Sequence, residues 1–258
     1  MSTLKIATWN VNSLRVRLPQ LVEWVAAASP DIIALQETKT VDADFPVADI
    51  EALGYHVAYA GQRTYNGVAI LSRAAITPVA TGIPSFTDEQ RRVLAVDTAG
   101  LRIIDLYVPN GQEPGSEKFA YKMRWLEALH GWLAAERAGD RKLVVLGDFN
   151  IAPEDRDVHD PAAWAGGVHV SPEEREALAT LLKIGFVDVF RAFEQPEKSY
   201  SWWDYRMGAF RRNHGLRIDL ILADIELAKH CTGCHIDREP RRAERPSDHT
   251  PVIAEFTL

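Results

Sequence analysis

Residues 142–150 read KLVVLGDFN, an apolar run that ends abruptly in Asp148 and Asn150. Its length and β-branched side chains predict a strand over residues 142–147, buried on both faces, with the acid and the amide at its end. Runs of the same kind, with polar side chains at one end or inside, are residues 4–9, 31–36, 101–107, 216–222 and 251–256. Shorter runs at residues 56–60, 68–72 and 93–97 complete a strand-rich pattern.

Helical patterns lie between these strands. Residues 19–28 carry apolar side chains at helix spacing, and Pro19 suits a first helical turn. Residues 116–138 form a long amphipathic pattern, and SPEE at residues 171–174 is a capping box that opens a helix over residues 172–183. No linker divides the chain. We therefore expect one domain over residues 1–258, with an α/β fold of two stacked sheets and helices on their outer faces.

The composition excludes several classes of protein. The 258 residues include 29 Lys and Arg against 36 Asp and Glu, a net charge of −7, and 47% are hydrophobic. These values exclude whole-chain disorder and a histone-like cationic DNA binder. The sequence shows neither a secretory signal nor an apolar run of about 18 residues, and its two cysteines predict no disulfide framework. We expect a cytoplasmic protein that does not act at a membrane.

The polar residues at the strand ends define one candidate site. Those that follow apolar runs are Asn10, Glu37, Tyr107, Asn110, Asp148 and Asn150. Asp219 lies inside a run, and Asp248 and His249 precede one. If the strands lie side by side, these side chains meet at one edge, where carboxylate and amide oxygens suit Mg²⁺ or Mn²⁺. Taken singly, an Asn is an ordinary turn residue, but a charge such as Asp219 inside a buried strand is costly without a partner, and a His is the natural one.

Seven motifs occur in sequence: WNVNSLR (Trp9–Arg15), LQETK (Leu35–Lys39), YVPNG (Tyr107–Gly111), GDFNIAP (Gly147–Pro153), SWWDYR (Ser201–Arg206), GLRIDLIL (Gly215–Leu222) and RPSDHTPV (Arg245–Val252). Together they resemble the exonuclease III family of DNA-repair nucleases, within the endonuclease/exonuclease/phosphatase superfamily. The resemblance implies a four-layer α/β sandwich of two mixed β-sheets flanked by helices. It also implies Mg²⁺-dependent hydrolysis of DNA phosphodiester bonds: 3′-to-5′ exonuclease action on double-stranded DNA, incision at abasic sites, and 3′-phosphatase or 3′-phosphodiesterase activity.

The resemblance further implies a role for each residue of the candidate site. Glu37 would be the principal metal ligand, in a set that comprises Asn10, Glu37, Asp148, Asn150, Asp248 and His249, for one ion or two, Mg²⁺ or Mn²⁺. Asp148 would orient or deprotonate the attacking water, and Asn150 would hold the scissile phosphate. His249 would contact a phosphate oxygen, with Asp219 fixing its tautomer. Tyr107 would face the phosphate or leaving group, with Asn110 supporting it.

Basic residues are unevenly placed, which points to a local DNA groove. Residues 202–245 hold nine Lys and Arg and seven Asp and Glu, and arginines alternate there with aromatic residues. This mixture suits stacking and insertion into a duplex, and it also suits core packing. The candidate substrate contacts are Asn110, Lys118, Lys122, Trp203 and Arg206, with Trp202, Leu216 and Ile218 implied by resemblance to form an abasic-sugar pocket. Further candidates for phosphate contacts are Lys39, Arg63, Tyr65 and Asn66.

The expected partner is double-stranded DNA with 3′ ends, nicks or abasic sites, bound by a monomer. Residues 155–174 depart from the family pattern, and His169, bulky and chargeable, follows the flexible pair Gly166–Gly167. We hypothesise that His169 narrows the groove and favours 3′ ends or gapped DNA over abasic duplex.

Other interpretations stay open at this point. CTGCH at residues 231–235 matches the string that attaches c-type haem, but the charged segment after it argues against haem, and a redox pair lacks its usual strand–helix setting. One alternative is an enzyme that mainly processes 3′ ends and has weak activity at abasic sites. Another is a lipid or inositol phosphodiesterase. A non-catalytic DNA-binding module would have no use for Glu37, Asp148 and Asp248 facing an anionic partner.

Overall fold

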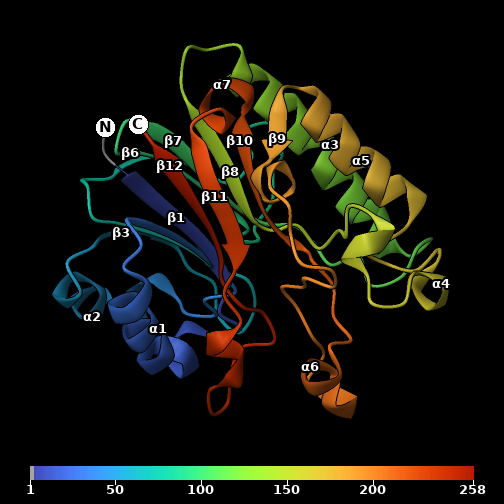
Figure 1. Cartoon of the computed structure of the whole chain (residues 1–258). Helices are drawn as coiled ribbons and strands as arrows, with labels where there is room; N and C mark the ends of the chain where they lie inside the picture. Colours follow the sequence, from blue (N-terminus) through green and yellow to red (C-terminus); the bar gives the residue numbers. More distant parts are fainter. Residues whose placement is uncertain (1–2) are drawn as a thin grey trace.

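The structure is a computed structural model that describes residues 3–258. Two six-stranded sheets pack face to face, and helices cover both outer faces (Figure 1). The four-layer α/β sandwich expected from the sequence is confirmed.

The first sheet has the strand order β11-β12-β1-β2-β4-β3. Its strands are β1 (Thr3–Asn10), β2 (Ile32–Gln36), β3 (His56–Ala60), β4 (Val68–Ser72), β11 (Cys231–Ile236) and β12 (Val252–Thr257). β1 and β2 run parallel, and Asn10 lies opposite Gln36 at their carboxyl ends. Asn10 and the next residue after β2, Glu37, therefore emerge at the same edge of this sheet.

The second sheet has the order β5-β6-β7-β8-β10-β9. Its strands are β5 (Thr77–Thr81), β6 (Val93–Thr98), β7 (Leu101–Tyr107), β8 (Leu143–Asp148), β9 (Phe186–Asp188) and β10 (Asp219–Asp224). Asp148 ends β8 between two neighbours: Tyr107 lies opposite it on parallel β7, and Asp219 lies opposite it on antiparallel β10. Gly147 precedes it with φ +141°, where an added Cβ would lie 1.9 Å from the carbonyl oxygen of Leu106, so only glycine fits.

Helices α1 (Leu14–Ala28) and α2 (Val47–Ala52) cover the first sheet, and α3 (Glu117–Arg137) and α5 (Pro172–Lys183) cover the second (Figure 1). Alternate residues of β1 face opposite sides of the sheet. Ile6 packs between the two sheets, whereas Ala7 and Trp9 pack against α1. Burial on both faces explains why the strands read as unbroken apolar runs. The short helices α4 (Pro161–Trp164), α6 (Ala209–Arg212) and α7 (Ile225–Ala228) lie in the connections.

Most expected elements are present, with local differences. α5 has the expected bounds, and its capping box forms between Ser171 and Glu174. α1 begins at Leu14 rather than at residue 19, so Pro19 lies inside the helix. Proline there removes one backbone hydrogen bond, but it stands close to the first turn, and the burial of Leu14 and Leu21 holds the helix against the sheet. The run 216–222 becomes a strand only from Asp219.

The CTGCH segment forms β11, an edge strand antiparallel to β12, with a bulge between Cys231 and Gly233. Both cysteines are free, and burial raises the pKa of each thiol, which favours the unreactive protonated form. The segment therefore serves as part of a sheet.

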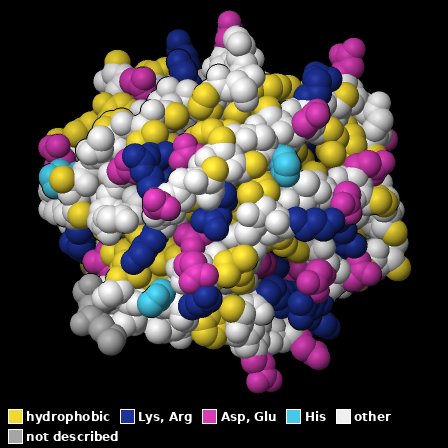
Figure 2. Space-filling view, turned by 90° about the horizontal axis from the view of Figure 1, so that it is seen from above, with side chains coloured by type: hydrophobic (Ala, Val, Ile, Leu, Met, Phe, Trp, Pro, Cys, Tyr) yellow, Lys and Arg dark blue, Asp and Glu magenta, His cyan; other side chains and the backbone are white. Residues whose placement is uncertain are grey.

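The start of β1 and the end of β12 lie side by side, with Thr3 opposite Thr257, at the end of the sandwich away from α6 (Figure 1). Figure 2 views this end, where Lys and Arg side chains are intermixed with Asp and Glu. Within residues 3–258, none of the helices combines the length and the apolar character that crossing a bilayer requires.

Candidate active site

Side chains from both sheets meet at the edge where β1, β2, β7 and β8 end. Glu37, Asp148 and His249 each present a ligand atom, and these atoms lie within 4.8 Å of one another. We call these three residues the edge cluster. Asn10 joins the two sheets at this point, because its Nδ2 donates to Glu37 Oε1 at 2.9 Å and to Asp148 Oδ2 at 2.9 Å.

Asn10 thus takes a role that differs from the expected one. Its Oδ1 accepts the backbone N–H of Asn12 at 3.0 Å, so the amide nitrogen, rather than the oxygen, faces the two carboxylates. The expectation that Asn10 offers an oxygen ligand is not supported by this arrangement. Asn10 is fully buried and orients the carboxylates of Glu37 and Asp148 instead.

His249 is held between two carboxylates. Its Nδ1 lies 2.9 Å from Asp219 Oδ2, and its Nε2 lies 3.6 Å from Asp148 Oδ2. Burial alone opposes the charged imidazole, but Asp219 and Asp148 outweigh it and raise the pKa of His249 to about 10. Burial likewise raises the pKa of Asp148 to about 7, although the charge of His249 opposes that rise. The imidazole therefore carries the proton at neutral pH.

Two serines fix the backbone of Asp219 and His249, and the sequence analysis singled out neither serine. Ser201 Oγ accepts the backbone N–H of Asp219 at 3.1 Å, and Ser247 Oγ accepts the N–H of His249 at 3.2 Å. Ser247 also donates to the carbonyl of Asn10 at 2.6 Å. Ser247 lies in the RPSDHTPV motif, two residues before His249, and this position was the sequence feature from which its role could have been inferred.

Glu37 stands on a strained turn beside a lysine. Glu37 and Lys39 have φ values of +51° and +53°, uncommon for residues with a Cβ. Lys39 Nζ lies 2.8 Å from Glu37 Oε2 and donates to Asn12 Oδ1 at 2.5 Å. Burial would raise the pKa of Glu37, but Lys39 and Asn10 outweigh it and lower the pKa. Lys39, expected to contact a phosphate, thus keeps the Glu37 carboxylate ionised.

Tyr107 adjoins the edge cluster at the end of β7. Burial, together with the charges of Glu37 and Asp148, raises the pKa of its phenol well above the usual value. Arg92, another residue that the sequence did not single out, lies over the ring at 4.7 Å and donates to the Tyr107 carbonyl at 3.3 Å. Tyr107 is therefore a neutral O–H donor at neutral pH.

Asn150 and Asn110 continue the site from β8 and β7. Asn150 adopts φ +50°, and its N–H donates to Asp148 Oδ1 at 2.9 Å. Its Nδ2 donates to the carbonyl of Val108 at 3.0 Å, and its Oδ1 accepts from Asn110 Nδ2 at 3.4 Å. Asn150 is buried and Asn110 is exposed, so Asn110 is the one that reaches solvent.

Asp248 does not join the edge cluster. Its Oδ1 accepts from Asn12 Nδ2 at 2.9 Å, and its Oδ2 accepts from Trp202 Nε1 at 3.0 Å. With both oxygens occupied in this way, Asp248 connects the turn after β1 to the Trp202 loop. Its expected place among the metal ligands stays a prediction, since Asp248 lies outside the three-residue cluster.

The residues implied for an abasic-sugar pocket do meet. Leu216 and Ile218 belong to one buried apolar cluster, and partly buried Trp202 and Trp164 pack against it. Leu216 and Ile218 are 0% and 2% exposed, whereas the two tryptophans are partly exposed, so only the tryptophans reach the surface. Lys118 and Arg206 are exposed, as a DNA contact requires, and Arg206 pairs with Asp204 at 2.8 Å.

Two residues expected to contact DNA, Trp203 and Lys122, have fully buried side chains. Trp203 is 0% exposed, packs edge-on against Phe210 and donates to Asn213 Oδ1 at 3.1 Å. Lys122 is also 0% exposed, and its ammonium pairs with Glu174. Neither side chain reaches the surface that a DNA strand would touch.

His169 lies next to the site but is not cationic. Its Nδ1 lies 2.7 Å from the carbonyl of Asn150, and its Nε2 lies 3.4 Å from Asn110 Nδ2. Burial, with the charge of Lys122, lowers the pKa of His169 to about 4. Nδ1 therefore carries the proton and Nε2 accepts. The bulk that the sequence hypothesis invoked is present at the site, whereas the positive charge is not.

The edge cluster has the chemistry of a site for a hard divalent cation. Two carboxylates lie within reach of each other, and Lys39 and Asn10 keep the pKa of the Glu37 carboxyl below its usual value. Carboxylate oxygens are ligands of the kind that Mg²⁺ and Mn²⁺ prefer. A protonated His249 offers no lone pair, so within this cluster it suits an anionic phosphate better than a cation.

Comparison with known proteins gives relatives along the whole chain. Residues 7–249 match the model of the endonuclease/exonuclease/phosphatase family. The chain is 35% identical to exodeoxyribonuclease III of Haemophilus influenzae, covering 98% of this chain and 100% of that protein. It matches the structure of a 3′ phosphatase from Neisseria bound to a product DNA hairpin, with TM-score 0.97 and 45% identity over 99% of this chain and 100% of that one. It also matches an AP endonuclease from Archaeoglobus fulgidus, with TM-score 0.95 and 42% identity over 99% and 100% of the two chains.

Proposed function

The chain belongs to the exonuclease III family of the endonuclease/exonuclease/phosphatase superfamily, and we propose that its edge cluster hydrolyses phosphodiester bonds at 3′ ends and abasic sites of double-stranded DNA. It is thus a DNA-repair nuclease, a hydrolase that acts on phosphodiester bonds. The observation that carries the assignment of the site is the meeting of Glu37, Asp148 and His249 within 4.8 Å. The proposed activities include removal of 3′ phosphates and other 3′ blocking groups, because these also require attack on a terminal phosphorus.

The residues around the cluster suit a direct attack by water. A phosphodiester is anionic, so its hydrolysis needs positive charge at the phosphate and a base at the nucleophile. In our proposal the His249 imidazolium, held by Asp219, contacts a phosphate oxygen. The Asp148 carboxylate orients the water and accepts its proton, with Asn150 beside it. The neutral phenol of Tyr107 donates a hydrogen bond to the phosphate or the leaving oxygen.

Glu37 and Asp148 would hold a divalent cation, with Mg²⁺ or Mn²⁺ as the proposed ion. A bound cation offsets negative charge on the phosphate and the leaving oxygen. Lys39 keeps Glu37 ionised, so the carboxylate needs no proton to leave before it binds a cation. Asn10 fixes the separation of the two carboxylates by donating to both.

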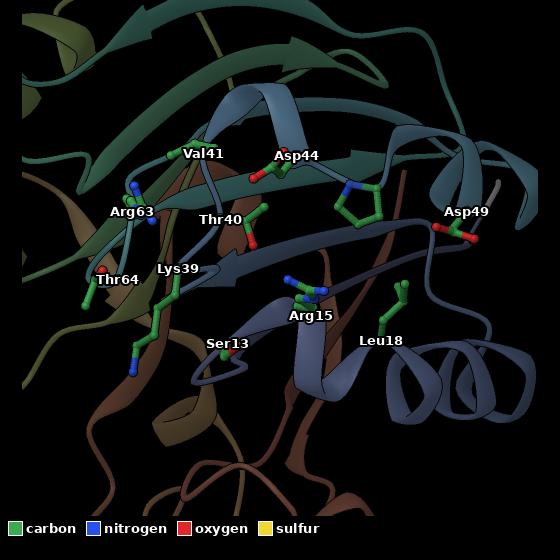
Figure 3. Close-up of a pocket in the computed structure, with 11 residues that line it drawn as sticks. Ser13, Arg15, Leu18, Lys39, Thr40, Val41, Asp44, Asp49, Arg63 and Thr64 are labelled. Carbon is green, nitrogen blue, oxygen red and sulfur yellow. The ribbon is translucent and has the colours of Figure 1, made fainter.

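A pocket beside the edge cluster, lined by three basic and two acidic side chains, is the proposed path of a DNA strand. The pocket has a volume of ≈ 900 Å³ and lies between the start of α1 and the turn that follows β2. Figure 3 shows Arg15 at the first turn of α1, with Lys39 and Arg63 on one side of the pocket and Asp44 and Asp49 toward the other. We propose that Arg15 and Arg63 bind backbone phosphates, a contact that positions the duplex without reading its sequence.

A preference for 3′ ends over abasic duplex is the second candidate, and the position of His169 favours it. The ring lies within 3.4 Å of Asn110 Nδ2 and 2.7 Å of the Asn150 carbonyl, at the side of the proposed phosphate site. Its bulk there would hinder an abasic nucleotide more than a frayed 3′ end. We further propose that the chain acts as one domain and as a monomer, since the edge cluster is complete within one chain. A location in the cytoplasm is also part of the proposal.

A panel of labelled duplexes tests the proposal. The substrates carry a recessed 3′ end, a 3′ phosphate or an abasic analogue, each incubated with Mg²⁺, with Mn²⁺ and with EDTA. We expect cleavage with either ion, none with EDTA, and a loss of about 10²–10³-fold in rate for Asp148→Asn. Intact DNA in every arm would reject the proposed function, and full activity of Asp148→Asn would reject the role of Asp148.

A further inference from the structure

A buried ion pair lies beneath the strand ends. Lys122 on α3 and Glu174 at the start of α5 are both 0% exposed, and Nζ lies 2.5 Å from Oε1. The two helices that carry them pack on the outer face of the second sheet (Figure 1). Burying two charges costs free energy, and apolar residues of similar size often serve a core as well or better. The pair therefore calls for an explanation other than stability.

Lys122 uses all its hydrogen-bond donors inside the protein. An ammonium group has three N–H donors. Here they face Glu174 Oε1 at 2.5 Å, the Asn150 carbonyl at 2.7 Å and the Asn110 carbonyl at 3.2 Å. Lys122 thus joins Asn150, two residues beyond β8, to Asn110, three residues beyond β7, and both of these belong to the site.

Both carboxylate oxygens of Glu174 likewise accept hydrogen bonds inside the protein. Its Oε1 also accepts the backbone N–H of His169 at 3.0 Å, and its Oε2 accepts the N–H and the Oγ of Ser171 at 3.1 and 2.6 Å. The His169 ring in turn donates to the Asn150 carbonyl at 2.7 Å. The Asn150 carbonyl is therefore fixed by two donors, and both donors are tied to Glu174.

Asn150 needs such support because of its backbone. Its φ of +50° is a strained conformation for a residue with a Cβ, even for asparagine, which tolerates it better than most. Its N–H donates to Asp148 Oδ1, so a shift of this backbone also moves the Asp148 carboxylate. The backbone of the strained residue is thus coupled to the edge cluster through Asp148.

We propose that Lys122 and Glu174 are positioning residues that hold Asn110, Asn150 and, through Asn150, Asp148 in the geometry of the reaction. The inference rests on the proposed function, because it concerns the same site. The pair acts through backbone carbonyls and does not touch DNA. Its removal therefore lowers kcat and leaves KM and DNA affinity unchanged.

The test uses a double variant, because removing one partner leaves the other as an unpaired buried charge. Lys122→Met/Glu174→Gln removes both charges and preserves side-chain length. The matched control is Arg102→Met/Glu136→Gln. Arg102 is 2% exposed and its NH1 lies 2.5 Å from Glu136 Oε2, at the opposite end of β7 from the site. Both variants lose an ion pair that holds a buried cation of the full-length protein, although Glu136 is partly exposed, and only the first pair lies next to the site.

For Lys122→Met/Glu174→Gln we expect kcat on a recessed 3′ end to fall about 10- to 100-fold at a KM within about twofold of wild type. The control keeps the wild-type kcat at temperatures where both proteins are folded. A rise in KM at constant kcat, wild-type kinetics, or equal losses of kcat in both variants would each overturn the inference.

A second readout does not depend on activity. The side-chain amide signals of Asn110 and Asn150, recorded by ¹H–¹⁵N NMR, should shift in the first double variant and stay in place in the control. Unchanged signals in both would contradict the positioning role. A wild-type enzyme that cleaves no DNA would instead contradict the proposed function, and the amide signals would still decide the inference.

Discussion

His249 Nδ1 lies 2.9 Å from Asp219 Oδ2, and both side chains are buried. His249 precedes β12 of the first sheet, and Asp219 begins β10 of the second, so the contact crosses the sandwich. It orients the imidazole and supplies the charge that raises the pKa of His249. The pair is therefore both a tether between the sheets and the source of positive charge in the site.

Removing the negative charge of Asp219 should slow DNA cleavage more than it weakens DNA binding. In Asp219→Asn the imidazole loses the carboxylate whose charge raises its pKa most. The pKa of His249 therefore falls, and a smaller fraction of it is protonated at neutral pH. We expect single-turnover cleavage to slow about 10²–10³-fold with KM little changed. Asp237→Asn, at the carboxylate that accepts from Trp24 outside the site, is the control and should keep the wild-type rate. A wild-type rate for Asp219→Asn would show that the pair is only structural.

Neutralising Glu37 should lower the affinity of the enzyme for Mg²⁺. Glu37→Gln removes one carboxylate of the edge cluster and leaves Lys39 without its partner. We expect the Mg²⁺ concentration for half-maximal activity to rise about 10- to 100-fold, measured after EDTA treatment and readdition of Mg²⁺. Exposed Glu51→Gln on α2 should behave as wild type. An unchanged Mg²⁺ titration for Glu37→Gln would exclude Glu37 as a ligand.

Removing the ring of His169 should change substrate preference. His169 has φ +73°, which glycine adopts freely, so His169→Gly relieves backbone strain while it opens the site. We expect the ratio of abasic cleavage to 3′-end trimming to rise about tenfold or more. His169→Asn, which also tolerates this φ, separates side-chain size from backbone effects. A ratio equal to that of wild type would end the hypothesis.

A buried acid in the core should make stability depend on pH. Burial raises the pKa of Asp105 well above its usual value, although Gln36 donates to it at 2.7 Å. The folded state then binds more protons than the unfolded state from about pH 4 up to the folded pKa, so stability falls as pH rises through that window. Asp105→Asn should remove a slope of up to about 1.4 kcal/mol per pH unit, seen in urea unfolding from pH 4 to 8.

The matched control for that titration is Asp49→Asn, at an exposed acid, which should keep the slope of wild type. Parallel curves for wild type and Asp105→Asn would show that Asp105 is ionised in the folded protein. The Asn variant still accepts from Gln36 through its oxygen, so loss of that hydrogen bond does not confuse the comparison.

Much of the fold could be predicted because its signals are local. The strands at residues 56–60, 68–72 and 101–107 and the capping box at Ser171 depend on neighbouring residues, and they occur where expected. The position of Glu37 and Asp148 after apolar runs, and of His249 before one, could also be predicted, because these patterns are local. The start of α1 was missed because the burial of Leu14 outweighs the local preference of Pro19.

The sequence by itself determined which residues form strands, which caps begin helices, and which acids, amides and imidazole stand where strands end. Only the tertiary structure decided what surrounds each side chain. It buried Lys122 and Trp203, which were expected to meet DNA, it made His169 neutral, and it turned the Asn10 nitrogen toward the carboxylates. Exposure, charge state and hydrogen-bond partners depend on segments distant in the sequence, whereas strand and helix patterns depend on neighbours within a few residues.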